Sequence, residues 1–205
     1  MTERGMIFNS EMVRAILDVR KTQTRRPVKF PVHDKNLGCE LAGNELAGEL
    51  SAGNYLNSAF GKPGDRIWVR ETFQGPLFDY DLMDSYCKDP TPFEKPEFCV
   101  YKADGVPAPE FYDADDELHC CWRPSIHMPR WASRILLEIT DVRVERLLSM
   151  SQDDARAEGV IAASGPMEAG LAFRELWDSI YGEESWNANP WVWVIEFKRV
   201  EGGAA

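Results

Sequence analysis

The segment RILLEITDVRVERL, residues 134–147, constrains the fold of this chain more than any other stretch. Ile135, Leu137 and Ile139 recur at every second position. This period of two is typical of a β-strand with one buried face. The segment therefore predicts a strand.

Three other segments predict strands because they are rich in β-branched and aromatic residues. They are GKPGDRIWVRETF (61–73), FCVYKADG (98–105) and WVWVIEFKRV (191–200). Three helices are predicted as well: one that begins at Asn9 or Ser10 and ends before Pro27, one at 151–159, and one near 166–181. Short strands with long irregular connections are typical of an α+β domain, here a small β-barrel with flanking helices.

The length of 205 residues suits one domain, residues 1–205. Two stretches are interpreted as insertions: 31–60, which has no firm hydrophobic period, and 75–97, which contains four prolines and many acidic residues. The chain has no G-x-G-x-x-G after a strand and no G-x-x-x-x-G-K-[ST]. Dinucleotide and nucleoside triphosphate chemistry are therefore not expected.

The charge is unevenly distributed. The net charge is −11, which argues against a protein that coats nucleic acid through bulk electrostatics. Residues 14–29 nevertheless contain six basic side chains and one acidic side chain. One positive segment on an acidic chain fits a small anionic or polar ligand, or a short nucleic-acid contact, better than a long groove.

No apolar run approaches the ~20 residues that cross a bilayer, and residues 1–14 lack the apolar core of a secretory signal. We therefore expect a cytoplasmic protein without a membrane partner, whose five cysteines are free thiols. The HCCW motif (119–122), even with Cys99 and His127, lacks the paired spacing of a tetrahedral metal site. No metal and no cofactor are expected.

The stretch ILDVRKTQTRRP (16–27) offers a nucleophile and a base. If the first helix continues to Thr24, Lys21 and Thr24 form an i, i+3 pair. A threonine hydroxyl attacks once a base removes its proton, and nearby arginines such as Arg25 and Arg26 would lower the pKa of the lysine. The alternative is a solvated basic helix end, stabilised by the helix dipole.

Glu158 is the acidic residue that is hardest to explain by local structure. It falls in the last turn of the helix predicted at 151–159, just before Gly159, where the helix dipole disfavours negative charge. A carboxylate kept at such a position suits acid–base chemistry. The alternative is an exposed glutamate that tolerates a small cost.

Two tryptophan-containing segments could hold a base. In WRPSIHMPRWASR (122–134), arginines such as Arg130 lie between aromatic residues, a combination that can stack on nucleobases. In WVRET (68–72), Trp68, Arg70 and Glu71 could line a pocket. Packed loops and the outer face of a strand are the alternatives for these segments.

Five stretches of the chain, taken in order, resemble the ASCH domain, a relative of the PUA fold: ILDVRKTQTRRP, GDRIWVRETF, YKADG, WRPSIHMPRWASR and WVWVIEF. Over its full length the chain is similar to the ASCH proteins of phages and prophages. The resemblance runs from Met6 to Val200. It implies a small β-barrel with flanking helices and a cleft beside the helix-end motif. The family usually has glycine at the position of Val19, and a β-branched residue resists positive φ.

The resemblance also implies a function. One bacterial ASCH enzyme removes the acetyl group from N4-acetylcytidine with a Lys, a Thr and a Glu, which correspond to Lys21, Thr24 and Glu158, while Arg26 matches an arginine two positions after the threonine. The expectation is an amidohydrolase for an N4-acylated cytosine nucleoside or base, with Arg26 and Arg70 orienting the substrate. Some members bind RNA, so a non-catalytic RNA-binding module, or a ribonuclease that uses the same cleft, is the alternative.

Overall fold

The structure is a computed structural model, and it describes residues 1–112, 117–161 and 168–200. Its α-helices are α1 (Ser10–Leu17), α2 (Gly43–Ser51), α3 (Met83–Lys88), α4 (Gln152–Ala157), α5 (Glu168–Tyr181) and α6 (Glu183–Asn187). Its strands are β1 (Glu3–Ile7), β2 (Gln23–Pro27), β3 (Val32–His33), β4 (Glu40–Leu41), β5 (Arg66–Arg70), β6 (Phe73–Gln74), β7 (Val100–Tyr101), β8 (Glu110–Tyr112), β9 (Leu118–Cys120), β10 (Leu136–Arg146) and β11 (Trp191–Arg199).

Five strands form one sheet in the order β1-β5-β10-β11-β2, and the remaining strands form the pairs β3-β4, β6-β7 and β8-β9. The α+β class predicted from the sequence is confirmed. Within the described residues, β1 and β2 end the strand order and no pairing joins them. The small barrel therefore stays a prediction.

The chain divides into two compact units. The first unit comprises Met1–Thr2, Ala15–Arg66 and Glu138–Arg199, and the second comprises Glu3–Arg14, Ile67–Leu137 and Val200–Ala205. The prediction of a single domain over residues 1–205 is not tested by this division, because contacts within a chain do not show which parts fold together.

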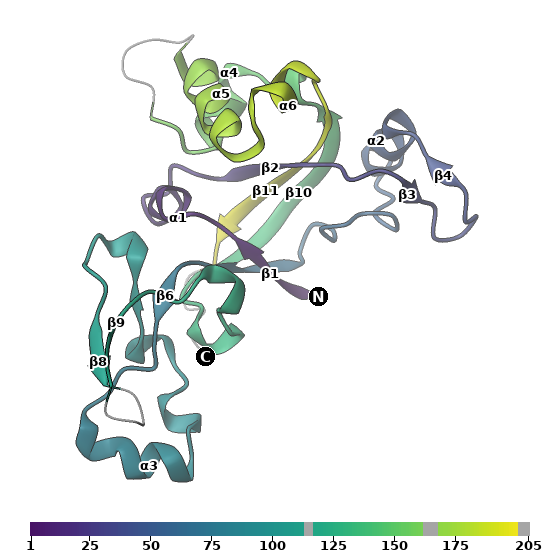
Figure 1. Cartoon of the computed structure of the whole chain (residues 1–205). Coiled ribbons are helices and arrows are strands. Elements are labelled where there is room, and N and C mark those ends of the chain that lie inside the picture. Colours follow the sequence, from purple (N-terminus) through teal and green to yellow (C-terminus); the bar gives the residue numbers. More distant parts are fainter. Residues whose placement is uncertain (113–116, 162–167, 201–205) are drawn as a thin grey trace. The chain divides into compact units, whose positions relative to one another are not determined.

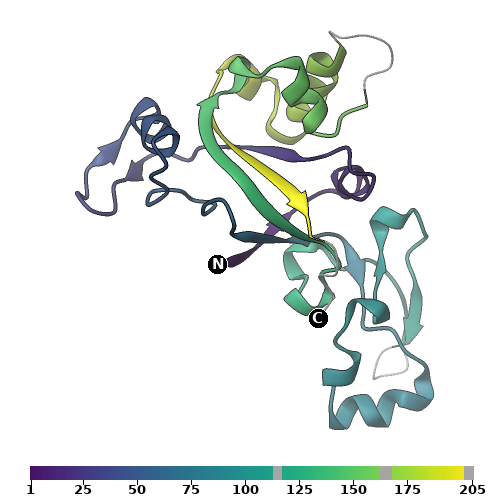
Figure 2. The same ribbon diagram turned by 180° about the vertical axis from the view of Figure 1, so that it is seen from behind.

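The helical layer of the first unit is α4, α5 and α6, which lie together beside β2, β10 and β11 in both views (Figures 1 and 2). On α5, Ala169, Phe173 and Trp177 recur every four residues and are buried, so one face of the helix is apolar. They pack in one cluster with Val192 and Val194, which share a face of β11. This packing fixes the helices against the sheet.

The predicted insertion at 31–60 contains regular structure that its sequence does not reveal. It holds the β3-β4 pair and α2, drawn in blue in Figure 1. Asn57 ties the segment together, because its Nδ2 donates to Asp34 at 3.2 Å and to Glu49 at 2.8 Å. The segment is therefore a small folded element of the first unit.

The second unit holds the other predicted insertion, residues 75–97. Here α3 lies among short 3₁₀ turns. Phe78, Tyr86 and Phe93 have ring centroids 4.7 to 5.7 Å apart and form an aromatic cluster. Aromatic packing thus gives this proline-rich stretch a fixed shape.

Candidate functional site

The first helix ends well before Lys21. α1 stops at Leu17, and Val19 then takes a positive φ of 60°. The carbonyl of Ala15 accepts the N–H groups of both Arg20 and Lys21 at 2.9 Å, which turns the chain away from the helix axis. Val19 is 73% exposed and closes the helix as a glycine would, so its β-branched side chain does not prevent this geometry.

The residues after this turn form strand β2, not a continuation of the helix. The prediction that Lys21 and Thr24 form an i, i+3 helical pair is therefore wrong. β2 pairs antiparallel with β11, with Thr24 opposite Ile195 and Arg26 opposite Trp193. Since side chains alternate along a strand, Gln23 and Arg25 share one face of β2 and Thr24 lies on the other.

Helix α4 brings Glu158 to Lys21. Ser151 caps α4 by accepting the N–H of Asp154 at 3.0 Å, and the side chain of Asp154 accepts the N–H of Ser151 in return. Glu158 follows the last turn, and Gly159, with φ 86°, lets the chain leave the helix. A Cβ at Gly159 would lie 2.8 Å from the Cβ of Lys21, so the two segments are in close contact.

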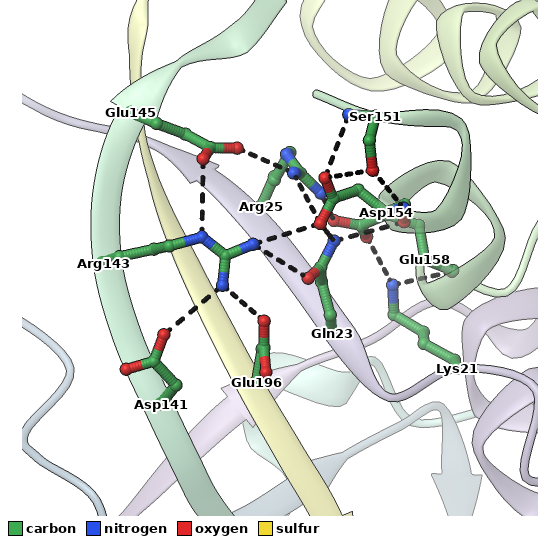
Figure 3. Close-up of polar contacts among 10 residues, drawn as sticks. All are labelled: Lys21, Gln23, Arg25, Asp141, Arg143, Glu145, Ser151, Asp154, Glu158 and Glu196. Atoms are coloured by element: carbon green, nitrogen blue, oxygen red, sulfur yellow. Dashed lines mark hydrogen bonds and ion pairs between the residues drawn. The ribbon is translucent and has the colours of Figure 1, made fainter. Parts of the chain in front are cut away.

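Lys21 and Glu158 form a buried ion pair (Figure 3). Nζ of Lys21 lies 2.7 Å from Oε2 of Glu158 and also donates to the Glu158 carbonyl at 2.9 Å. The side chains are 0% and 2% exposed, respectively. The structure thus brings together two of the three residues that the sequence nominates for catalysis, and the alternatives of an exposed Lys21 and an exposed Glu158 are wrong.

Burial lowers the pKa of Lys21 below its ordinary value of 10.5. The carboxylate of Glu158 opposes this effect, and the positive charges of Arg26 and Arg25 add to it. The direction predicted from the sequence is confirmed, although burial is the larger cause. Arg20 bonds elsewhere, to the Gly159 carbonyl at 2.7 Å.

Arg25 is a second cation that bonds Glu158. From the sequence alone, Arg25 was identified only as a nearby charge that would lower the pKa of Lys21. Its Nη1 lies 3.1 Å from Oε1 of Glu158, and its Nη2 lies 2.8 Å from Glu145. The Arg25 side chain is 0% exposed. Asp154 is 3.5 Å from the same Nη2. Arg25 therefore links α4 to β10.

Arg143 extends this network along β10 and β11 (Figure 3). Its guanidinium contacts Glu145 at 3.4 Å and Asp154 at 3.1 Å, and it is also bonded to Glu196. Gln23 donates to the Asp154 side chain at 3.2 Å. Burial alone would raise the pKa of Asp154, but hydrogen bonds with Ser151 and Gln23 and the charge of Arg25 lower it to about 2.

Thr24, the predicted nucleophile, is 1% exposed on the face of β2 opposite Gln23 and Arg25. Within the part of the chain that the structure describes, no hydrogen bond joins Thr24 to Lys21 or Glu158. The catalytic role of Thr24 is therefore still a prediction.

Four predicted substrate-binding residues belong to the second unit, and each has a partner there. Arg70 lies 5.5 Å from the ring of Trp68. Glu71 is 1% exposed and accepts two bonds from Arg134, at 3.0 and 3.1 Å. Arg130 pairs with Glu3 at 3.1 Å. These partners are internal ones, so the geometry does not single out these residues as ligand contacts.

Two of the hollows formed by described residues lie on the first unit, and neither of these two is lined by Lys21, Thr24 or Glu158. One, of about 720 Å³, includes Glu40 and Trp191. The other, of about 340 Å³, lies along α5 and α6. All three nominated catalytic residues are at most 2% exposed. A substrate therefore reaches them only when neighbouring side chains move aside.

The described residues contain no group of three or more His, Cys, Asp or Glu side chains that could hold a metal ion. All five cysteines are free, as predicted. Among the described helices, none combines the length and the apolar character that crossing a membrane requires. No family model, curated protein or solved structure matches this chain.

Proposed function

We propose that this chain is an amidohydrolase that acts on an N4-acylated cytosine nucleoside or base, with an ASCH domain of PUA-like barrel architecture. The ASCH-like motifs support the substrate class. The observation that carries the chemistry is the buried Lys21–Glu158 pair, in which a lysine of lowered pKa bonds a carboxylate at 2.7 Å. A lysine of lowered pKa gives up its proton more readily than an ordinary lysine and can then act as a base.

In the proposed reaction, the Thr24 hydroxyl attacks the acyl carbon and its proton passes to Lys21 in its neutral form. Lys21 bonds the same carboxylate as Arg25, on the face of β2 opposite Thr24, so this step requires a movement of residues 21–24 that brings the two side chains together. The bond between the acyl carbon and N4 breaks, and N4 receives a proton from the Lys21–Glu158 pair, so cytidine leaves as the amine. Water then hydrolyses the acyl–threonine ester and releases the carboxylic acid. Arg26, which lies on the Thr24 face of β2, orients the substrate.

The experiment is incubation of purified protein with N4-acetylcytidine and chromatographic measurement of cytidine. The variants are Lys21→Met, Glu158→Gln and Thr24→Val. Exposed neighbours give the matched controls Lys29→Met and Thr22→Val. The wild type and both controls are expected to turn over. Lys21→Met and Glu158→Gln are expected to lose roughly 10²-fold or more in kcat, the contribution of a general acid or base.

Two outcomes would overturn the proposal: no release of cytidine by the wild type, or full activity in Lys21→Met. If Thr24→Val retained activity, Thr24 would not be the nucleophile, and the attack on the acyl carbon would be assigned to water. The roles of Lys21 and Glu158 would then still stand. Binding of N4-acetylcytidine or RNA without any turnover would favour the non-catalytic binding module.

A further inference from the structure

The carboxylate of Glu158 is divided between two cations (Figure 3). Lys21 bonds Oε2 at 2.7 Å and Arg25 bonds Oε1 at 3.1 Å. The side chains of all three residues are at most 2% exposed. Water therefore does not compete for the carboxylate, and the two cations fix the direction in which each oxygen points.

A second carboxylate, that of Glu145, holds the guanidinium of Arg25 through the nitrogen that does not bond Glu158. Its Nη2 bonds Glu145 at 2.8 Å, and Glu145 is in turn bonded by Arg143 at 3.4 Å. A guanidinium can bond two carboxylates at once through its planar fork, whereas a lysine ammonium acts as a single point of charge. Arg25 thus relays the position of β10 to Glu158, a connection that lysine at position 25 would break.

We propose that Arg25 is a positioning residue that holds the Glu158 carboxylate with one oxygen on Lys21. The proposal rests on the proposed function, because it assigns Arg25 a role in proton transfer between Lys21 and Glu158. Arg25 bonds Glu158 and not the reacting group, so it acts on the reaction only through the orientation of that carboxylate.

Two effects of Arg25 on Lys21 have opposite signs, and this separates positioning from charge alone. The positive charge of Arg25 lowers the pKa of Lys21, while a correctly placed Glu158 raises it. Arg25→Lys keeps the charge but loses the fork. If Arg25 positions Glu158, the carboxylate moves away in this variant and the pKa of Lys21 falls further. If Arg25 acts by charge alone, the pKa of Lys21 stays as in the wild type.

The test compares Arg25→Lys with the control Arg156→Lys, an arginine of α4 that is 48% exposed and contacts Asp153. The first readout is NMR titration of ¹³C-labelled lysine, with the Lys21 signal assigned by its loss in Lys21→Met. The second is the steady-state rate with N4-acetylcytidine. In Arg25→Lys we expect a lower pKa of Lys21 and a fall in kcat of roughly 10- to 100-fold with KM nearly unchanged, as for a group that misplaces a catalytic residue.

An unchanged pKa of Lys21 in Arg25→Lys would overturn the positioning role, as would an equal effect of Arg156→Lys. If Arg25→Lys does not fold, Glu145→Gln removes the anchor of Arg25 and is expected to shift the pKa in the same direction. If the wild type shows no turnover, the proposed function fails, yet the NMR titration still decides whether Arg25 positions Glu158.

Discussion

Nζ of Lys21 lies 2.7 Å from Oε2 of Glu158, although 137 positions separate the two residues in the sequence. Because both side chains are buried, removing one partner leaves an uncompensated charge. Glu158→Gln is expected to lower the free energy of unfolding by about 3–5 kcal/mol. Urea denaturation measures this loss, and Glu184→Gln, at an exposed site, is the control, expected within about 0.5 kcal/mol of wild type.

The double variant Lys21→Met with Glu158→Gln completes a cycle for the same pair. It is expected to be more stable than the sum of the two single losses indicates, because no unpaired lysine remains. Additive losses in this cycle would contradict the direct coupling that the geometry indicates.

The stability of the protein is expected to depend on pH through Lys21. Its folded-state pKa lies below 10.5, mainly because of burial, so between the two values the unfolded chain binds more protons than the folded chain. Stability contributed by Lys21 therefore rises with pH across this window. The difference in unfolding free energy between wild type and Lys21→Met should increase as the pH rises toward 10.5. The tyrosines and cysteines are the same in both proteins, so their effects cancel in this difference. A difference in unfolding free energy that stays flat or falls with pH would contradict the lowered pKa of Lys21.

Asp154 gives a dependence of the same sign, but at acid pH. Burial raises its pKa, but the bonds with Ser151 and Gln23 outweigh burial and lower it from 3.8 to about 2. Its contribution is fully present above 3.8 and is lost as the pH falls toward about 2. Asp154→Asn should therefore reduce stability at neutral pH by about 1–2 kcal/mol and flatten the acid limb of the unfolding curve.

Asp153, next to it in the sequence, is the matched control. Its side chain is 91% exposed and contacts only the exposed Arg156 among the described residues. Asp153→Asn should change stability by less than about 0.5 kcal/mol. Equal losses in the two variants would show that the network around Asp154 does not stabilise the fold.

Val19 is expected to be a destabilising residue. Its φ of 60° places the Cβ against its own carbonyl, at a cost of about 1–2 kcal/mol. Val19→Gly removes this cost but increases the freedom of the unfolded chain, which offsets about 0.5–1 kcal/mol. A net gain of about 0.5–1 kcal/mol should appear in urea denaturation. At Gly105, which has φ 79° and open space around it, Gly105→Ala should have the opposite effect.

Hydrophobic periodicity predicted the parts of the fold in which one face is apolar. The alternation of Ile135, Leu137 and Ile139 predicted the strand that begins at Leu136 as β10, and the helix predicted near 166–181 is α5, in which Phe173 and Trp177 are buried. In both, burial of a stripe of side chains decides the local structure, so the pattern is visible without knowledge of the partner.

The same reasoning missed β2, because the side chains that β2 buries are polar. Lys21, Gln23 and Arg25 have a period of two, but they are charged or polar residues that become buried only when α4 and β10 supply partners. The sequence pattern of a basic helix end and that of a strand with a buried ionic face are therefore alike. Period-two spacing of Lys21, Gln23 and Arg25 was the available signal.

Glu158 could be nominated because the helix dipole disfavours its position, which is a local argument. Its partner could not be derived in that way. Arg143 and Glu145 look like the solvated face of β10, since Val142 and Val144, which alternate with them, are the apolar side. Only the pairing of β2 with β11 and the packing of α4 show that this polar face is an ion network.

The division of one carboxylate between Lys21 and Arg25 restricts how related sequences can diverge. A lineage that replaces any one of Lys21, Arg25 and Glu158 passes through a form with an unbalanced buried charge. Neutral drift at these three positions is thereby suppressed, and substitutions are expected to occur as correlated sets. An alignment of relatives should therefore show covariation among the three positions, while exposed neighbours such as Thr22 vary independently.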